Sequence, residues 1–181
     1  MVDTTKAEEL TTIFSYGSNH PDQLSTRLKV SKDYLLAKSF PCSLEGYTRA
    51  YGRISYTWGG SVATMVPQEG ARAFGYACKL NSEELEILNG YEGYPTCYRR
   101  EKVELKHPNG SVVPGEVYIA NNDEEYKDPC PKYLTACQKT EKAYYDLQTG
   151  IDNPYASHEE VKITVKRASN LEEVFVYPRP Q

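Results

Sequence analysis

Glu92 is the residue of this chain whose surroundings best fit proton-transfer chemistry. It lies in the segment Tyr91-Glu92-Gly93-Tyr94-Pro95, and Tyr98 follows shortly after. A carboxylate among aromatic rings loses part of its hydration, which raises its pKa and makes it a better general base or acid near neutral pH. We therefore expect Tyr91, Tyr94 or Tyr98 to bury Glu92. The simpler alternative is an ordinary surface glutamate with no chemical role.

The turn Tyr16-Gly17-Ser18-Asn19 is a second candidate for chemistry. It follows a β-branched and aromatic segment typical of a strand, and it precedes Pro21, which favours the first position of a helix. A glycine between a strand and a helix lets successive backbone N–H groups point into one concavity, which suits an anionic oxygen. The alternative is an ordinary connecting turn in which Asn19 caps the helix.

Other familiar catalytic arrangements are not indicated. Of the three histidines, His107 belongs to a Pro-Asn-Gly turn, His158 to an acidic run, and His20 to a helix entry. The glycine turn lacks the Lys-Ser/Thr ending of a phosphate loop. Five cysteines occur without a Cys-x-x-Cys pair or a histidine at zinc spacing, so we expect no metal and reduced thiols in a cytoplasmic protein.

Composition excludes several further classes of function. The net charge is -4, and no stripe of lysine and arginine suggests nucleic acid as a partner. No stretch approaches the roughly 18 apolar residues of a membrane span, and the N-terminus lacks the apolar core of a signal peptide. Sixteen tyrosines supply buried area with a polar tip. These features predict one folded domain over residues 1–181.

The elements that must position the two candidates follow from hydrophobic patterns and turn signals. Strands are expected at 11–16, 62–66, 71–80, 99–106 and 112–120, in a stretch at 36–56 broken by Pro41 and Gly46, and in two short runs at 161–165 and 174–177. Helices are expected at 21–28, from the capping pair Asn81 and Glu84 to about Gly90, and from Pro131 to Gly150. Glu92 would then lie just past a helix end. The class is α+β, a mixed, barrel-like sheet with flanking α-helices.

Four segments in order resemble the gamma-glutamylcyclotransferase family, whose fold is also called AIG2-like. Besides the Tyr16–Asn19 turn and Glu92-Gly93, the segment Trp58-Gly59-Gly60-Ser61-Val62-Ala63-Thr64 looks like the family's Gly-Gly-x-Ala-Thr strand entry. The stretch from Leu85 to Tyr98 looks like its Leu-…-Glu-Gly-…-Tyr segment. The resemblance spans residues 13–150, which gives a catalytic core of about 12–150 and a C-terminal extension of 151–181.

The resemblance implies a reaction that needs neither metal nor cofactor. Members convert a γ-glutamyl amide to 5-oxoproline and a free amine, because the substrate's own α-amine attacks its γ-carbonyl. It implies that Glu92 is the acid/base and that the remaining positions bind the small-molecule γ-glutamyl substrate: Tyr16, Gly17, Ser18, Asn19, Tyr98 and Tyr133. We expect γ-glutamyl amino acids first, γ-glutamyl-ε-lysine second and glutathione third. A non-catalytic, ligand-binding member of the fold is the alternative, and a homodimer is a further expectation.

Overall fold

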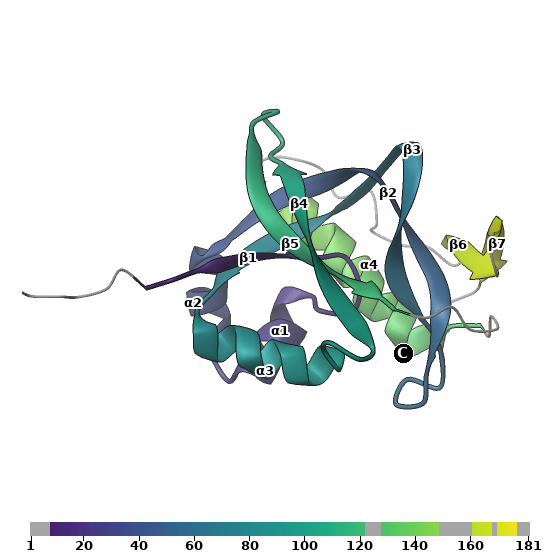
Figure 1. The fold of residues 1–181 in the computed structure, drawn as a ribbon, viewed down its shortest axis with the longest axis horizontal. Helices are drawn as coiled ribbons and strands as arrows, with labels where there is room; N and C mark the ends of the chain where they lie inside the picture. The colour runs from purple at the N-terminus through teal and green to yellow at the C-terminus, as the bar shows by residue number, and fades with distance from the viewer. Residues whose placement is uncertain (1–7, 122–127, 149–160, 168–169, 177–181) are drawn as a thin grey trace, which may run out of the picture.

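Five strands close into a small mixed barrel (Figure 1). The computed structural model describes residues 8–121, 128–148, 161–167 and 170–176. The sheet order is β3-β1-β5-β4-β2, and pairing between β2 and β3 closes the ring. Within this ring only the β1–β5 pair is parallel. The strands are β1 (Thr11–Ser15), β2 (Ser39–Ser55), β3 (Gly60–Leu80), β4 (Tyr98–Lys106) and β5 (Val112–Ala120).

A further hairpin extends the sheet beyond the barrel. Strands β6 (Val161–Arg167) and β7 (Asn170–Val176) pair antiparallel, and β6 runs parallel to β2 with Tyr51 opposite Val165. Both short strands predicted near the C-terminus are therefore present, with somewhat different ends. Tyr177, the predicted last residue of the second, lies outside the described residues, as do residues 151–160 at the start of the predicted extension 151–181.

Four helices flank the barrel in the part of the chain that the structure describes. Three of them gather below the barrel in Figure 1, whereas α4 packs against β2 and β3. They are α1 (Pro21–Leu28), α2 (Lys32–Ala37), α3 (Ser82–Glu92) and α4 (Pro131–Asp146). None of these helices has the length and apolar character needed to cross a bilayer.

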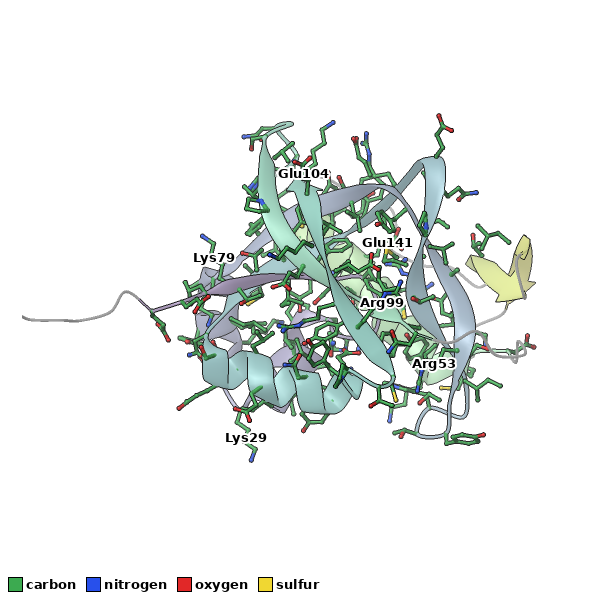
Figure 2. All side chains as sticks on the ribbon, in the orientation of Figure 1. Lys29, Arg53, Lys79, Arg99, Glu104 and Glu141 are labelled. Carbon is green, nitrogen blue, oxygen red and sulfur yellow. The ribbon has the colours of Figure 1, made fainter. Side chains whose placement is uncertain are left out.

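The interior contains two clusters of buried apolar side chains, one for each group of helices. Figure 2 shows the side chains filling the space between the ribbons, while Lys29 and Glu104 point away from the body. The cluster between the barrel and α4 includes Phe14, Met65, Leu105, Val117 and Leu134. The cluster between the barrel and α1 to α3 includes Leu24, Leu28, Leu35, Tyr76 and Leu88.

The predicted element types are confirmed, but the predicted interruptions of the strands are not: β2 and β3 are each continuous. Pro41 and Gly46 do not interrupt β2, because Pro41 keeps its register opposite Tyr76 and Gly46 sits at a β-bulge with φ 79°. The predicted strands 62–66 and 71–80 are one continuous strand, β3. The short helix α2 was not predicted, since its six residues are too few to produce a clear helical period.

The helix before Glu92 is longer than predicted. It does not stop near Gly90 but runs to Glu92, and Gly93 ends it in the left-handed conformation with φ 63°. A glycine inside a helix costs roughly 1 kcal/mol without ending it, whereas a positive φ does end it. Glu92 is thus the last residue of α3 rather than a loop residue. Likewise α4 begins at Pro131 as predicted but ends at Asp146, before Gly150, which lies outside the described residues.

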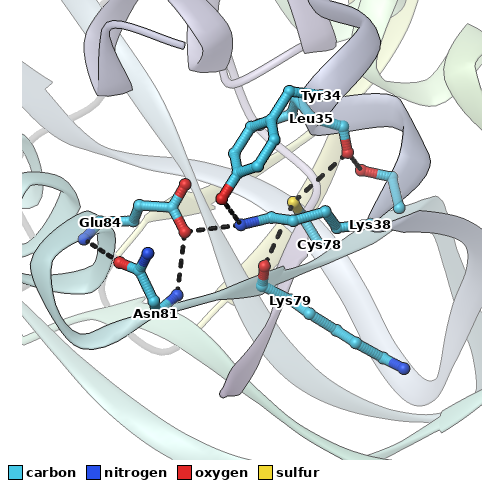
Figure 3. A network of polar contacts seen from close by, with 8 residues as sticks. Tyr34, Leu35, Lys38, Cys78, Lys79, Asn81 and Glu84 are labelled. Carbon is cyan, nitrogen blue, oxygen red and sulfur yellow. Dashed lines mark hydrogen bonds and ion pairs between the residues drawn. The ribbon is translucent and has the colours of Figure 1, made fainter. Parts of the chain in front are cut away.

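A buried ion pair fixes the start of α3 (Figure 3). Asn81 and Glu84 form the predicted capping box, and the Glu84 carboxylate also accepts a 2.6 Å bond from Lys38 Nζ. Burial by itself lowers the pKa of Lys38, but the bonds to Glu84 and Tyr34 outweigh it, so the pKa is raised. The Glu84 and Lys38 side chains are only 6% and 17% exposed. The pair therefore joins α3 to the residue after α2.

Removing the cation of this pair should destabilise the fold. Lys38→Met leaves the Glu84 carboxylate buried without its partner, so we expect the free energy of unfolding to fall by about 3 kcal/mol. Lys106→Met is the matched control, because Lys106 pairs with Glu45 at the surface and such pairs contribute at most about 1 kcal/mol. Urea denaturation measures both, and equal losses would contradict a special role for the buried pair.

Candidate active site

A cavity of about 260 Å³ opens between the barrel and the ends of α1 and α3. Its lining contains every site residue that the sequence predicted, drawn from four separate segments of the chain. These residues are Tyr16, Gly17, Ser18, Asn19, Glu92, Tyr98 and Tyr133. The barrel and its helices therefore bring the predicted set together in one place.

The turn after β1 is held by three hydrogen bonds from different strands. The Tyr16 hydroxyl donates to the carbonyl of Tyr118 at 2.6 Å, and Arg49 Nε donates to the Tyr16 carbonyl at 2.6 Å. The Tyr76 hydroxyl donates to the Asn19 carbonyl, also at 2.6 Å. Each bond has a partner far away in the sequence. The turn is therefore positioned by the closed barrel rather than by local preference alone.

Asn19 does not cap the following helix, which was the simpler interpretation of the turn. His20 occupies the N-cap position and makes no side-chain cap. The Asn19 side chain instead points to the end of α3, where its Nδ2 donates to Glu92 Oε1 at 2.9 Å. Its Oδ1 accepts a 2.7 Å bond from Arg27 on α1. The amide thus links the turn, the first helix and the carboxylate.

Burial raises the pKa of Glu92, as predicted, although the residue as a whole is only half-buried. The charges of Arg27 and Arg53 and the hydrogen bond from Asn19 oppose this rise but do not cancel it. A carboxyl group with a raised pKa holds a proton more readily than one in water. It can therefore both accept and return a proton near neutral pH.

The aromatic residues that surround this carboxylate differ from most of those predicted. Tyr91 lines the cavity together with Glu92 but is 56% exposed, and Tyr94, 38% exposed, is not among the lining residues. The tyrosines close enough to feel its charge are Tyr16, Tyr98 and Tyr118: burial raises the pKa of each hydroxyl, and the Glu92 carboxylate adds to the rise. Of the three predicted neighbours, only Tyr98 fulfils that role.

Tyr98 and Tyr133 meet at the backbone of Ala63. The Tyr98 hydroxyl donates to the Ala63 carbonyl at 3.0 Å, whereas the Tyr133 hydroxyl accepts from the Ala63 N–H at 2.7 Å. A hydroxyl has one donor and two acceptor positions. Tyr98 is thus left with acceptor capacity, whereas the Tyr133 hydroxyl also forms a hydrogen bond with the Cys137 side chain. Tyr133 also lies beside the turn, since a Cβ on Gly17 would be 3.4 Å from its hydroxyl.

Two arginines of the cavity were not identified from the sequence. Arg27 and Arg53 are, with Glu92, the charged side chains among the described lining residues. Arg27 also lies over the Tyr91 ring, 4.8 Å from its centroid. Neither arginine belongs to a motif, and their place depends on how α1 and β2 meet around the cavity. The structure describes no group of three or more His, Cys, Asp or Glu side chains suited to a metal.

The barrel and its flanking helices define a gamma-glutamylcyclotransferase-like fold. The structure has a TM-score of 0.63 with a solved gamma-glutamyl cyclotransferase that is 21% identical, covering 83% of this chain and 93% of that one. It has the same TM-score with YkqA from Bacillus subtilis, at 20% identity, over 80% of this chain and 56% of that one. At these identities the likeness shows a shared fold.

The sequence comparison establishes the family. Residues 13–145 match the model of the gamma-glutamyl cyclotransferase, AIG2-like family, and the chain belongs to that family. It is also similar to human gamma-glutamylcyclotransferase, with 27% identity over 128 residues. That match covers 70% of this chain and 67% of the human protein.

The raised pKa of Glu92 predicts how its replacement changes stability with pH. Glu92→Gln keeps an acceptor for Asn19 but cannot ionise. Because the folded state holds the Glu92 proton more tightly than the unfolded state, the wild type loses stability as pH rises from about 4.3 through the folded pKa. The variant should therefore gain relative stability over that window. Urea denaturation from pH 4 to 8 measures the free energy of unfolding of both proteins. If the wild type became more stable relative to the variant as pH rises, the prediction would be contradicted.

Proposed function

We propose that the protein converts γ-glutamyl amides to 5-oxoproline and a free amine. The observation that carries the proposal is the Glu92 carboxyl group, which faces the cavity with a raised pKa and is oriented by Asn19. Membership of the gamma-glutamyl cyclotransferase, AIG2-like family supports the same reaction.

Glu92 serves as base and then as acid. The α-ammonium of the substrate gives a proton to the carboxylate, and the freed amine nitrogen forms a bond to the γ-carbonyl carbon. The bond from that carbon to the amide nitrogen then breaks, and Glu92 returns its proton to the departing nitrogen. The ring nitrogen gives up its second proton as well, which the departing amine also accepts, so that the lactam is neutral and the amine leaves as an ammonium ion. No water or other reactant is consumed. Holding the glutamyl chain folded for this attack can contribute roughly 7–11 kcal/mol.

The turn and Tyr133 supply hydrogen-bond donors for the substrate's oxygens. Gly17 and Ser18 line the cavity, and we propose that their backbone N–H groups bind either the α-carboxylate or the oxyanion that develops on the γ-carbonyl. The Tyr133 hydroxyl lies beside Gly17, and it serves as a further donor when it turns from the Cys137 side chain to the substrate. Tyr98 has acceptor capacity for the ammonium group.

γ-Glutamyl amino acids are the substrates that we propose first, followed by γ-glutamyl-ε-lysine and then glutathione. All three present the same glutamyl group to Glu92 and differ only in the departing amine. The cavity of about 260 Å³ favours a small amine over a tripeptide. A non-catalytic, ligand-binding protein remains the alternative function.

An assay for 5-oxoproline with a panel of γ-glutamyl compounds tests the proposal. We expect product from the wild type and a loss of about 10²–10⁴-fold in Glu92→Gln, because the variant has no carboxylate to transfer the proton. Glu86→Gln is the control, since Glu86 is an exposed residue of the same helix and should be fully active. A folded wild type that forms no 5-oxoproline from any compound of the panel would refute the reaction and favour ligand binding.

A further inference from the structure

Arg53 is a cationic side chain of the cavity that forms no ion pair with any residue that the structure describes. It lies near the end of β2, lines the cavity together with Ser55 and Thr57, and is half-buried. Its guanidinium carbon is 5.4 Å from the centroid of the Tyr98 ring. None of the ion pairs among the described residues includes Arg53. In Figure 2 its label lies toward the lower end of the β2–β3 ribbon.

Arg27, the other arginine of the cavity, is already engaged. Its Nη1 donates to Asn19 Oδ1 at 2.7 Å, and its guanidinium lies over the Tyr91 ring. Through Asn19 it is also tied to Glu92. Arg27 is therefore part of the frame that holds the turn and the carboxylate, whereas Arg53 is available to an incoming anion.

The charged side chains of the cavity are complementary to the charges of one substrate class. The described lining residues contribute two guanidinium groups and one carboxylate. A γ-glutamyl amino acid with a neutral side chain carries the opposite set, two carboxylates and one ammonium. A γ-glutamyl amide of a simple alkylamine has only one carboxylate, and γ-glutamyl-ε-lysine adds a second ammonium. The charge balance thus fits the γ-glutamyl amino acid best, and half-buried arginines bind carboxylates well.

The reaction geometry assigns the two carboxylates to different places. If Glu92 takes the proton of the α-amine, the glutamyl α-carboxylate, one carbon away, must lie beside the turn to which Glu92 is bonded. The departing amino acid is attached to the γ-carbonyl carbon, at the other end of the glutamyl chain from the α-carboxylate. Arg53 makes no bond to the turn, so it is the cation left for the second carboxylate.

We propose that Arg53 binds the carboxylate of the departing amino acid and so selects γ-glutamyl amino acids over γ-glutamyl amides that lack this group. This inference rests on the proposed function. It makes Arg53 a specificity residue that contacts the leaving group and takes no part in proton transfer. A bidentate pair between guanidinium and carboxylate is the expected contact.

Two matched substrates isolate the contact. γ-Glutamylalanine and γ-glutamylethylamide differ only in the carboxylate of the leaving amine. Because the charge of Arg53 also acts on Glu92, its loss affects both substrates, and the ratio of their kcat/KM values isolates the contact. We expect Arg53→Gln to lower kcat/KM for γ-glutamylalanine by roughly 10- to 100-fold more than kcat/KM for γ-glutamylethylamide. Arg53→Lys should fall between, because it keeps the charge but loses the planar fork. Arg72→Gln is the control, since Arg72 is exposed and pairs with Glu45 at the surface.

Turnover of γ-glutamylethylamide by the variant also shows that the variant is folded. Equal losses on both substrates would overturn the inference, because Arg53 would then act on the glutamyl group or on the structure. No loss on either substrate would overturn it as well. A wild type that converts neither compound would instead refute the proposed function, and the assignment of Arg53 with it.

Discussion

The hydrogen bond between Asn19 and Glu92 is the contact on which the arrangement of the cavity depends. It joins a turn near the N-terminus to the end of a helix 73 residues later. The turn is itself fixed by hydrogen bonds from Tyr76 and Arg49 on the barrel. The end of α3 is fixed by the left-handed Gly93. Barrel closure is therefore a condition for the site, since it brings both segments to one opening.

Tyrosine hydroxyls do much of this positioning, which gives the unusual number of tyrosines in the sequence a structural reason. Around the cavity each of five tyrosines has its hydroxyl bonded to backbone or to an amide side chain while its ring is wholly or largely buried: Tyr16, Tyr76, Tyr98, Tyr118 and Tyr133. A ring of this kind excludes water, and its polar tip satisfies a group that would otherwise be buried without a partner. Three of them, Tyr16, Tyr98 and Tyr118, lie close enough to Glu92 to interact with its charge, and burial raises the pKa of Glu92.

A glycine turn and a capping box are local signals, and they singled out the Tyr16–Asn19 turn and the helix that ends at Glu92. Tyr98 and Tyr133 were predicted as site residues only from the family resemblance. Local signals failed where tertiary structure decided the outcome. Arg53 follows a register shift in β2 after Tyr51, and such a shift changes the face on which a side chain lies, so alternation could not place it. Arg27 reaches the cavity only because α1 packs near α3. Tyr91 and Tyr94 are near Glu92 in the sequence, but both side chains are exposed, even though Tyr91 also lines the cavity. The predicted homodimer, the cytoplasmic location and the single domain remain predictions.

The most direct test of the account compares two titrations of the same carboxyl group. The ¹³C NMR signal of Glu92, assigned by its loss in Glu92→Gln, gives the pKa in the free protein. The pH dependence of kcat/KM for 5-oxoproline formation from γ-glutamylalanine gives the pKa of the group that must be ionised for attack. We expect the two midpoints to coincide, and both to lie above the reference value of about 4.3. A Glu92 pKa at or below that value would contradict Glu92 as the base. A midpoint of the kcat/KM profile that differs from the pKa of Glu92 would contradict it as well.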